Sequence, residues 1–168
     1  FVGGSNNEMP HSMIVDTGGN LIIAGKTYST NYPVTSGAYD TSANGGVDII
    51  VTKISADGGS LVGSTYIGGT GDDGINISSA NYKTGQVLMF ESQRPGIEKG
   101  AYYSVEAIDK AGNIYVASCS RSNDFPVTTS AVKSTMTDSQ DGVVFKLNPT
   151  VTTLTWSTYV GGTDDDAA

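Results

Sequence analysis

Short stretches of apolar and polar residues in alternation, separated by turn residues, run through the first half of the chain. This pattern is typical of β-strands. The expected strands are Ser12–Asp16, Leu21–Lys26, Asp48–Ile54 and Leu61–Ile67. Turns rich in Gly, Asn, Asp and Ser join the first pair and the last pair, so each pair forms a β-hairpin. Four such sequential strands predict one antiparallel meander. The third strand is apolar at nearly every position, which predicts burial on both faces.

The second half of the chain repeats the first. Ser12–Gly69 aligns on Val105–Gly162 without a gap at an offset of 93 residues, and eighteen aligned positions are identical. Internal repetition of this kind indicates a repeat architecture. The expected strands of the second unit are Val105–Asp109, Ile114–Ser118, Gly142–Leu147 and Leu154–Val160.

One motif occurs three times. Ser64–Asp73 (STYIGGTGDD) returns as Ser157–Asp166 (STYVGGTDDD), and its Gly-Gly pair is also present in Phe1–Ser5 (FVGGS). We interpret Phe1–Gly4 as the end of a further strand. The first two Gly-Gly pairs are 65 residues apart and the next two 93, so a segment of 28 residues is inserted after the second motif.

The insertion interrupts the repeat. Within it, Ile75–Ser78 and Gln86–Phe90 could pair as a hairpin, so the insertion is either a decorating hairpin or the remnant of another unit. The sequence therefore divides into three parts: a first repeat at 1–73, the insertion at 74–100 and a second repeat at 101–168.

A single meander exposes two open edges and apolar faces, and stacking of repeated units covers them. We therefore predict an all-β fold of β-propeller blades, about two blades plus the inserted hairpin. A β-sandwich and a β-solenoid are the rival folds. Two units cannot close a ring, because propellers use about four to eight blades. The chain is then a fragment of a longer protein, or several copies close a ring together, or the units pack on a different domain or partner. No stretch predicts a helix longer than one turn, and the best candidate, Ser130–Thr137, is rich in poor helix formers.

Four spaced motifs occur twice and together carry a family resemblance. They are Asp-x-x-Gly-Asn (Asp16–Asn20, Asp109–Asn113), Tyr/Phe-Pro-Val-Thr (Tyr32–Thr35, Phe125–Thr128), the third strand with its Val and Lys (Asp48–Ile54, Asp141–Leu147), and Ser-Thr-Tyr-Ile/Val-Gly-Gly-Thr (Ser64–Thr70, Ser157–Thr163). The combination resembles the bacterial β-propeller repeat known as the SBBP repeat, over nearly the whole chain outside Gly74–Gly100. The resemblance implies a secreted or cell-surface bacterial protein, often large and multidomain. It implies no catalytic residues, because the family motif is a signature of the fold.

Composition and charge narrow the range of functions. The 22 glycines and nine tyrosines fit short strands joined by tight turns. Nine basic against 17 acidic residues give a net charge of −8, which disfavours binding to nucleic acid or to anionic membrane surfaces. Cys119 is the only cysteine, so no internal disulfide can form, and no apolar run has transmembrane length.

Paired acids are the first candidates for chemistry. Asp72-Asp73 and Asp165-Asp166 lie at equivalent positions after the Gly-Gly motif. Oxygen-rich turns can ligate calcium, so these four aspartates are candidate calcium ligands. The alternative is that they cap the turn between units by accepting backbone N–H groups. The D-x-D-x-D-G spacing of a known calcium loop is missing. Asp16 and Asp109 are interpreted as hairpin-turn residues.

Four single features complete the candidates. His11 is the only histidine and is expected at the surface. Cys119 lies on an expected strand and is interpreted as a small buried hydrophobic residue. Trp156 replaces Gly63 of the first unit and is expected to pack between units, or, if exposed, to stack on a sugar. Asn76-Ile77-Ser78 matches the N-glycosylation acceptor, a match that is common by chance.

The sequence therefore predicts a non-catalytic structural, adhesive or ligand-binding module, secreted or at the bacterial cell surface, with no catalytic, cofactor-binding or metal site assigned. The polar loops Thr27–Gly46 and Arg121–Gln140 would form its recognition surface. The expected partners are other blades or domains of a longer parent chain, neighbouring chains, or surface glycans. One alternative is a carbohydrate-active propeller enzyme, in which acids with shifted pKa values would converge at one end of the ring axis. Another is an assembly subunit whose open strand edges pair with other chains.

Overall fold

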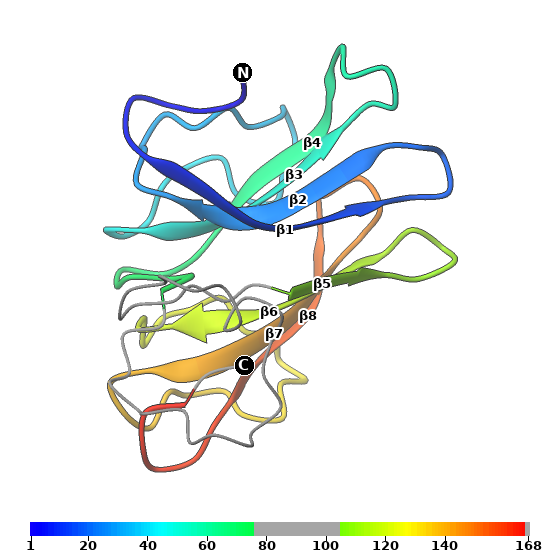
Figure 1. The fold of residues 1–168 in the computed structure, drawn as a ribbon. Helices are drawn as coiled ribbons and strands as arrows, with labels where there is room; N and C mark the ends of the chain where they lie inside the picture. The colour runs from blue at the N-terminus through cyan, green and yellow to red at the C-terminus, as the bar shows by residue number, and fades with distance from the viewer. Residues whose placement is uncertain (76–104, 167–168) are drawn as a thin grey trace, which may run out of the picture.

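The computed structural model describes residues 1–75 and 105–166, which form two stacked four-stranded sheets (Figure 1). Both sheets are antiparallel, with the strands in chain order. We call the first sheet with its loops unit 1 and the second unit 2. Unit 1 contains β1 (Glu8–Val15), β2 (Leu21–Thr27), β3 (Asp48–Ile54) and β4 (Leu61–Ile67). Unit 2 contains β5 (Val105–Ile108), β6 (Ile114–Ser120), β7 (Asp141–Leu147) and β8 (Leu154–Val160).

The strands agree closely with those expected from the alternation of residues. β3, β4 and β8 have the predicted bounds, and the other strands differ by one or two residues except β1. The described residues contain no helix, in keeping with the sequence, and none of them forms a helix that could cross a membrane. The burial of β3 on both faces is confirmed, since only Ile54 at its end is less than fully buried. The hairpin expected within 74–100, and with it the site at Asn76, falls on residues outside those the structure describes.

The N-terminal region differs from its prediction. β1 begins at Glu8, before the expected start at Ser12, and carries a bulge between Pro10 and Ser12. A proline has no N–H to donate, and an edge strand such as β1 tolerates it. Phe1–Gly4, which we expected to be the end of a strand, forms no strand in the structure.

The two hairpin turns form as predicted. Asp16 Oδ1 accepts hydrogen bonds from the backbone N–H groups of Gly18 (2.8 Å) and Asn20 (2.9 Å). Asp109 Oδ1 accepts the same two bonds in unit 2, both at 2.9 Å. Each aspartate therefore organises the turn between the first two strands of its unit, through the side-chain-to-backbone bonding that favours Asp in turns.

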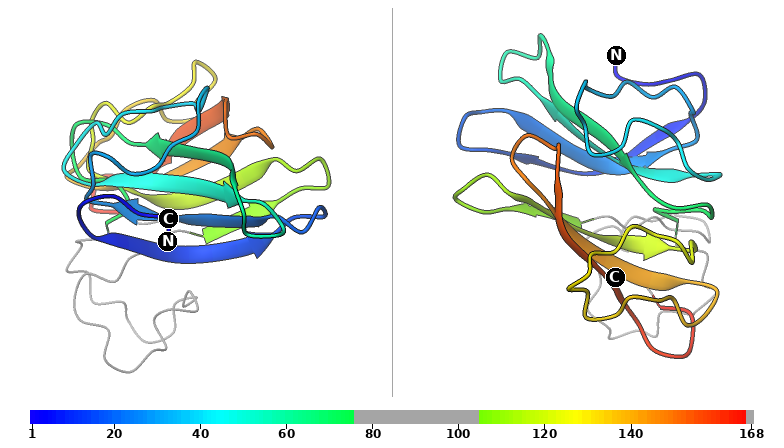
Figure 2. Two further views of the ribbon diagram at one scale, coloured as in Figure 1. Left: turned by 90° about the horizontal axis from the view of Figure 1, so that it is seen from above. Right: turned by 180° about the vertical axis from the view of Figure 1, so that it is seen from behind.

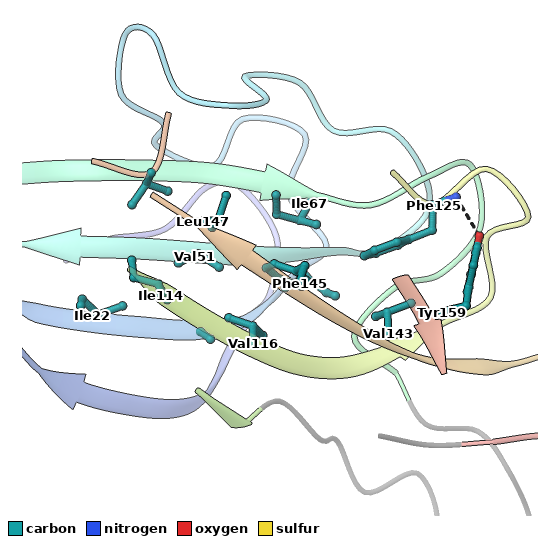
Figure 3. Packing of buried hydrophobic residues seen from close by; sticks show 13 residues of the cluster. Ile22, Val51, Ile67, Ile114, Val116, Phe125, Val143, Phe145, Leu147 and Tyr159 are labelled. Carbon is teal, nitrogen blue, oxygen red and sulfur yellow. Dashed lines mark hydrogen bonds between the residues drawn. The ribbon is translucent and has the colours of Figure 1, made fainter. Parts of the chain in front are cut away.

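One hydrophobic core joins the two sheets. Side chains alternate between the two faces of a strand, so each unit has two faces, which we name front and back. The front face of unit 1 carries Ile22, Ala24, Ile49, Val51 and Ile67, and it packs on the back face of unit 2, which carries Ile114, Val116, Val143, Phe145 and Leu147 (Figure 3). Each of these ten side chains is at most 1% exposed.

The contact joins unlike faces of the two units. Val51, on the front face of unit 1, is equivalent to Val144, which alternates with the core residues Val143 and Phe145 and so lies on the front face of unit 2, away from unit 1. The β1–β2 and β5–β6 hairpins accordingly extend to the same side of the molecule (Figures 1 and 2). A contact related by two-fold symmetry would instead join like faces. The units therefore stack head to tail.

The long loops cover the back face of their own sheets. In unit 1, Tyr32 packs on Ile50 and Tyr66, its N–H donates to the Tyr66 hydroxyl (2.7 Å), and its own hydroxyl lies 2.9 Å from Thr52 Oγ1. In unit 2, the N–H of Phe125 donates to the Tyr159 hydroxyl at 3.1 Å (Figure 3). The segments that we predicted as recognition loops are thus anchored to the sheets by buried aromatic residues.

Candidate functional site

The candidate functional site is the contact between units together with its uncovered counterpart on unit 2. Residues 68–73 form its first element, and we call them, with the related segments 3–8 and 161–166, the Gly-Gly connectors. The chain leaves β4 and bonds to both sheets. On the side of unit 1, the N–H of Asp73 donates to the carbonyl of Val47 at 2.7 Å. On the side of unit 2, the N–H of Arg121 donates to the carbonyl of Asp72 (3.0 Å) and that of Gly74 to Cys119 (2.8 Å).

Side chains of unit 2 complete the connector. Thr70 donates its N–H and its hydroxyl to Asp124 Oδ1, at 2.8 and 3.0 Å. The Ser122 hydroxyl accepts from the N–H of Gly71 (2.9 Å) and donates to Asp73 Oδ2 (2.7 Å). Asp73 Oδ2 also accepts the N–H of Gly69 at 2.8 Å. A single buried carboxylate therefore ties the turn of the connector to the neighbouring unit.

The N-terminal segment makes the same contacts on unit 1. Ser5 donates its N–H and hydroxyl to Asn31 Oδ1, at 2.9 and 3.0 Å, as Thr70 does to Asp124. The N–H of Asn6 donates to Ser29 Oγ at 2.8 Å. Glu8 takes the place of Asp73: its Oε1 accepts from the N–H of Gly4 (3.1 Å) and from the hydroxyl of Ser29. The Gly-Gly pair was the sequence signal for this connector, but Glu8 was not recognised because it differs from Asp.

The third connector, 161–166, extends from unit 2 in the same turn. The N–H of Asp166 donates to the carbonyl of Gln140 at 2.9 Å, and Asp166 Oδ2 accepts the N–H of Gly162. Two of the four candidate calcium ligands, Asp73 and Asp166, thus cap turns. The other two bond elsewhere: Asp72 lies 3.8 Å from the Arg121 guanidinium, and Asp165 accepts from the Ser139 hydroxyl. Within residues 1–75 and 105–166, no three His, Cys, Asp or Glu side chains gather as a metal site.

Buried acids lie near the connectors but do not form an accessible cluster. Burial raises the pKa of Asp48 to about 6 and also raises the pKa of Asp73. Their side chains are at most 2% exposed, and both carboxylates accept backbone N–H groups. A polar depression lies apart from them beside the N-terminal connector 3–8, lined by Ser5, Asn6, Asn7 and Tyr28.

The turn after β7 inserts into the front face of unit 1. Val151, at the tip of this turn, is fully buried and covers Gly63. A Cβ on Gly63 would lie 2.7 Å from the carbonyl oxygen of Thr150 and 2.9 Å from Val151 Cγ2, so only glycine leaves room for this contact. The contact is tied by hydrogen bonds from Lys53 Nζ to the Pro149 carbonyl (3.2 Å) and from the N–H of Tyr39 to the Val151 carbonyl (3.2 Å).

Val151 adopts a backbone conformation that β-branched residues rarely take. Its φ is 62°, in the left-handed region, and the equivalent residue in unit 1 is Gly58 with φ 71°. Left-handed backbone costs a valine of the order of 1–3 kcal/mol. Burial of the valine side chain against unit 1 is worth a similar amount, so packing between units offsets the local strain.

The front face of unit 2 is the uncovered counterpart of this contact. Trp156 stands at the position of Gly63, and Tyr115 at that of Ile22; the two rings meet edge to face with centroids 6.1 Å apart. Both side chains are only half-buried, and Val160 is 48% exposed whereas its equivalent, Ile67, is fully buried. Trp156 therefore does not pack between the two described units, as we had expected, but lies on the face turned away from unit 1.

Two further candidates are placed by the structure. Cys119 is a fully buried cysteine near the end of β6, as predicted. His11 lies in β1 and is half-buried.

No protein-family model and no curated protein sequence matches this chain. The resemblance to the SBBP repeat therefore stays a prediction that rests on the motifs in the sequence.

Proposed function

We propose that this protein is a structural module of head-to-tail β-units, in which the front face of unit 2 receives the back face of another unit of the same kind. The front-to-back contact between units 1 and 2 is the observation that carries the proposal. A contact between unlike faces leaves one face of each kind unpaired, so it propagates until a ring closes. Repetition around an axis would give a β-propeller, in line with the motifs in the sequence.

The unpaired faces carry apolar side chains that the contact would cover. On the back face of unit 1, Val15 is 59% exposed, whereas its equivalent Ile108 packs against the common core. On the front face of unit 2, Trp156 and Val160 are partly or largely exposed at positions where unit 1 is buried. Apolar patches of this kind mark protein interaction sites.

The shapes of these two faces are complementary. At the existing contact, a bulky turn residue (Val151) covers a glycine on the sheet (Gly63). At the unpaired faces the sizes are reversed: Trp156 projects from the sheet, and the turn of unit 1 carries Gly58, where an added Cβ would meet no atom within 4 Å. The indole of Trp156 would then occupy the space that a valine fills at the first contact. The partner we propose is accordingly unit 1 of a second copy of the chain.

The proposal extends to the setting that the sequence predicts, a secreted or cell-surface bacterial protein in which such units space or display other domains. An enzyme is not favoured, because the described acids with raised pKa values, Asp48 and Asp73, are at most 2% exposed. The structural role needs only the stacking of units, which a measurement on this chain tests directly.

Light scattering over a range of concentrations, up to about 1 mM, measures the association. We expect the mass to rise above the 17.4 kDa of one chain. Trp156 is the only tryptophan, so its emission should shift to the blue as it becomes buried. The control Val132→Ser removes an apolar side chain that is 96% exposed on a loop and should leave association unchanged.

A pair of exchanges tests the size complementarity. Gly58→Val copies the turn of unit 2 and should block association by colliding with Trp156. Trp156→Gly copies the receiving position of unit 1, and the double variant should associate again. A chain that stays monomeric at all concentrations, or a double variant no better than Gly58→Val alone, contradicts the proposal.

A further inference from the structure

Residues 40 and 133 are equivalent in the repeat but carry opposite charges. The N–H of Asp40 donates to Thr65 Oγ1 (2.9 Å), and its carbonyl accepts from the N–H of Tyr66 (3.2 Å). Lys133 makes the same two bonds in unit 2, at 2.9 and 3.1 Å. Both side chains therefore start from the same place relative to their sheets, and the difference between them is one of chemistry.

In unit 2 the ammonium group of Lys133 is surrounded by oxygen atoms. Lys133 Nζ lies 2.8 Å from Asp141 Oδ2, 2.7 Å from Thr137 Oγ1 and 3.2 Å from the carbonyl oxygen of Gly161. The Asp141 side chain is fully buried. A buried carboxylate needs a compensating charge, and the lysine supplies it from within the chain.

Unit 1 keeps the oxygen atoms but lacks the lysine. Its equivalent residues are Asp48, Asn44 and Gly68, and Asp40 brings a second carboxylate in place of the ammonium. Asp48 is 2% exposed, and its Oδ1, like Oδ1 of Asp141 in unit 2, has no hydrogen-bond partner. Its Oδ2 accepts the N–H of Asn44 at 3.1 Å, as Asp141 accepts that of Thr137 at the same distance. Among residues 1–75 and 105–166, no Lys or Arg forms an ion pair with Asp48.

The amide of Asn44 lies at the centre of this arrangement. Its Nδ2 donates to Asp40 Oδ2 at 2.5 Å and lies 3.5 Å from the carbonyl oxygen of Gly68. The equivalent carbonyl in unit 2, that of Gly161, binds the ammonium of Lys133. A half-turn of the Asn44 amide would present Oδ1 at the same place. Asn44 is exposed and Asp40 half-exposed, so the position is reachable from solvent.

We propose that unit 1 binds a calcium ion between Asp40, Asn44, Asp48 and the carbonyl of Gly68, at the place where unit 2 holds the Lys133 ammonium. Calcium takes six to eight oxygen ligands, among them carboxylates, amide and backbone carbonyls, and waters. Two carboxylates and two neutral oxygens fit this preference, with water completing the shell. This site is distinct from the acid pairs Asp72-Asp73 and Asp165-Asp166, and it does not depend on the stacking of further units.

The charges around Asp48 favour a cation beside it. Burial raises the pKa of Asp48 to about 6, and the nearby charges of Asp73 and Asp40 act in the same direction. A cation in this place would favour the ionised form of Asp48.

Calorimetric titration of the whole chain with calcium chloride tests the site. We expect one ion per chain, with a dissociation constant on the order of 10⁻⁴ to 10⁻³ M, the range of weak calcium sites in proteins. Thermal unfolding should shift to higher temperature in about 10 mM calcium and not in sodium chloride of equal ionic strength. Asp57→Asn, which alters an exposed turn of unit 1, is the control and should keep both responses.

Two exchanges between the units make the test specific. Asp40→Lys with Asn44→Thr copies unit 2 and should abolish binding while raising the melting temperature without calcium. Lys133→Asp with Thr137→Asn copies unit 1 and should raise the stoichiometry from one to two. Asp40→Asn, which is nearly isosteric, covers the case in which the first pair fails to fold and should weaken binding at least tenfold. The proposal is overturned if the natural chain neither binds nor is stabilised, or if Asp40→Asn binds as well as the natural chain.

Discussion

The Asp–Lys pair that each unit carries has a different environment in each. In unit 1, Lys53 Nζ lies 2.8 Å from Asp16 Oδ2, and both side chains are 8% exposed. In unit 2, Lys146 Nζ lies 3.8 Å from Asp109 Oδ2, with side chains 18% and 34% exposed. Lys146 instead lies over the ring of Tyr115, with its Nζ 5.0 Å from the centroid.

The cause of the difference is the neighbouring unit. Lys53 donates a further hydrogen bond to the Pro149 carbonyl of unit 2, which covers the pair. No described residue of another unit covers Lys146 in this way, because Lys146 lies on the uncovered front face of unit 2. The hydrogen bond from Lys53 holds the pKa of Asp16 far below its ordinary value, whereas the largest influence on Asp109 is the hydrogen bond from Asn113, which holds its pKa at about 2. The contribution of equivalent residues to stability therefore depends on whether another unit packs over them.

The largest effect is expected from giving unit 1 the surface of unit 2. Gly63→Trp would force a large side chain into the space held by Thr150 and Val151, and overpacking of this size should destabilise by about 3 kcal/mol or more. The reverse exchange, Trp156→Gly, alters a half-buried side chain and should cost clearly less. Urea unfolding measures both, and equal losses would contradict the asymmetry between the two front faces.

Removing the lysines comes next. Lys53→Met leaves the carboxylate of Asp16 buried without its cation, which should cost about 3 kcal/mol. Lys146→Met removes a lysine that solvent reaches and should have a much smaller effect. A similar change in the urea midpoint for the two variants would mean that unit 2 does not bury the Asp16–Lys53 pair.

The buried carboxyl group of Asp48 should make the stability of the chain depend on pH. The pKa of Asp48 in the folded chain, about 6, lies above the ordinary value of about 3.9 for an unfolded chain. The stability linked to this group is therefore present below pH 4 and is lost as pH rises through 6. In calcium-free buffer, Asp48→Asn should be more stable than the natural chain by about 3 kcal/mol at pH 7 and should match it at pH 4.

The equivalent change in unit 2 provides the contrast. Asp141→Asn should destabilise at pH 7, because Lys133 would lose the carboxylate that it contacts at 2.8 Å. Urea unfolding at pH 4, 5, 6 and 7 follows both variants. A loss of stability in Asp48→Asn at pH 7 would contradict the raised pKa.

The smallest effect is expected where the units are alike. The amide of Asn20 donates to Asp16 Oδ2 at 2.9 Å, and that of Asn113 to Asp109 Oδ2 at 2.8 Å. Replacing either Asn by Ala removes one hydrogen bond within a hairpin turn and should cost about 1 kcal/mol. Thermal unfolding should show nearly equal losses, and a large difference would mean that stacking reaches the turns as well.

Much of the fold could be predicted from the sequence because strand alternation and turn chemistry are local. The bounds of β3 and the turn at Asp16 follow from neighbouring residues alone. The face of each strand that meets the other unit could not be predicted: Val51 and Val144 are identical residues at equivalent positions, yet only Val51 lies in the common core. That distinction depends on which unit has a neighbour, which the pattern along one strand does not encode.

The candidate site was predictable only in part, for the same reason. The Gly-Gly motif indicated the connectors, but the role of Glu8 depends on the position of Ser29 across the sheet. The exchange of Gly63 for Trp156 was visible in the alignment, but the alignment did not show that the indole lies on the face turned away from unit 1. The difference between Asp40 and Lys133 was also visible in the alignment. Its consequence could not be predicted, because it depends on the buried carboxylates of Asp48 and Asp141.

The pairing of Val151 with Gly63 also bears on how such a chain avoids misassembly. Tandem sequences that resemble one another can dock in the wrong order while they fold. In the proposed stack, the bulky residue would lie on the turn at one contact (Val151) and on the sheet at the next (Trp156), so each contact would have its own shape. A unit that docked on the wrong neighbour would either clash with it or leave a cavity. These side chains would therefore favour the correct order of units.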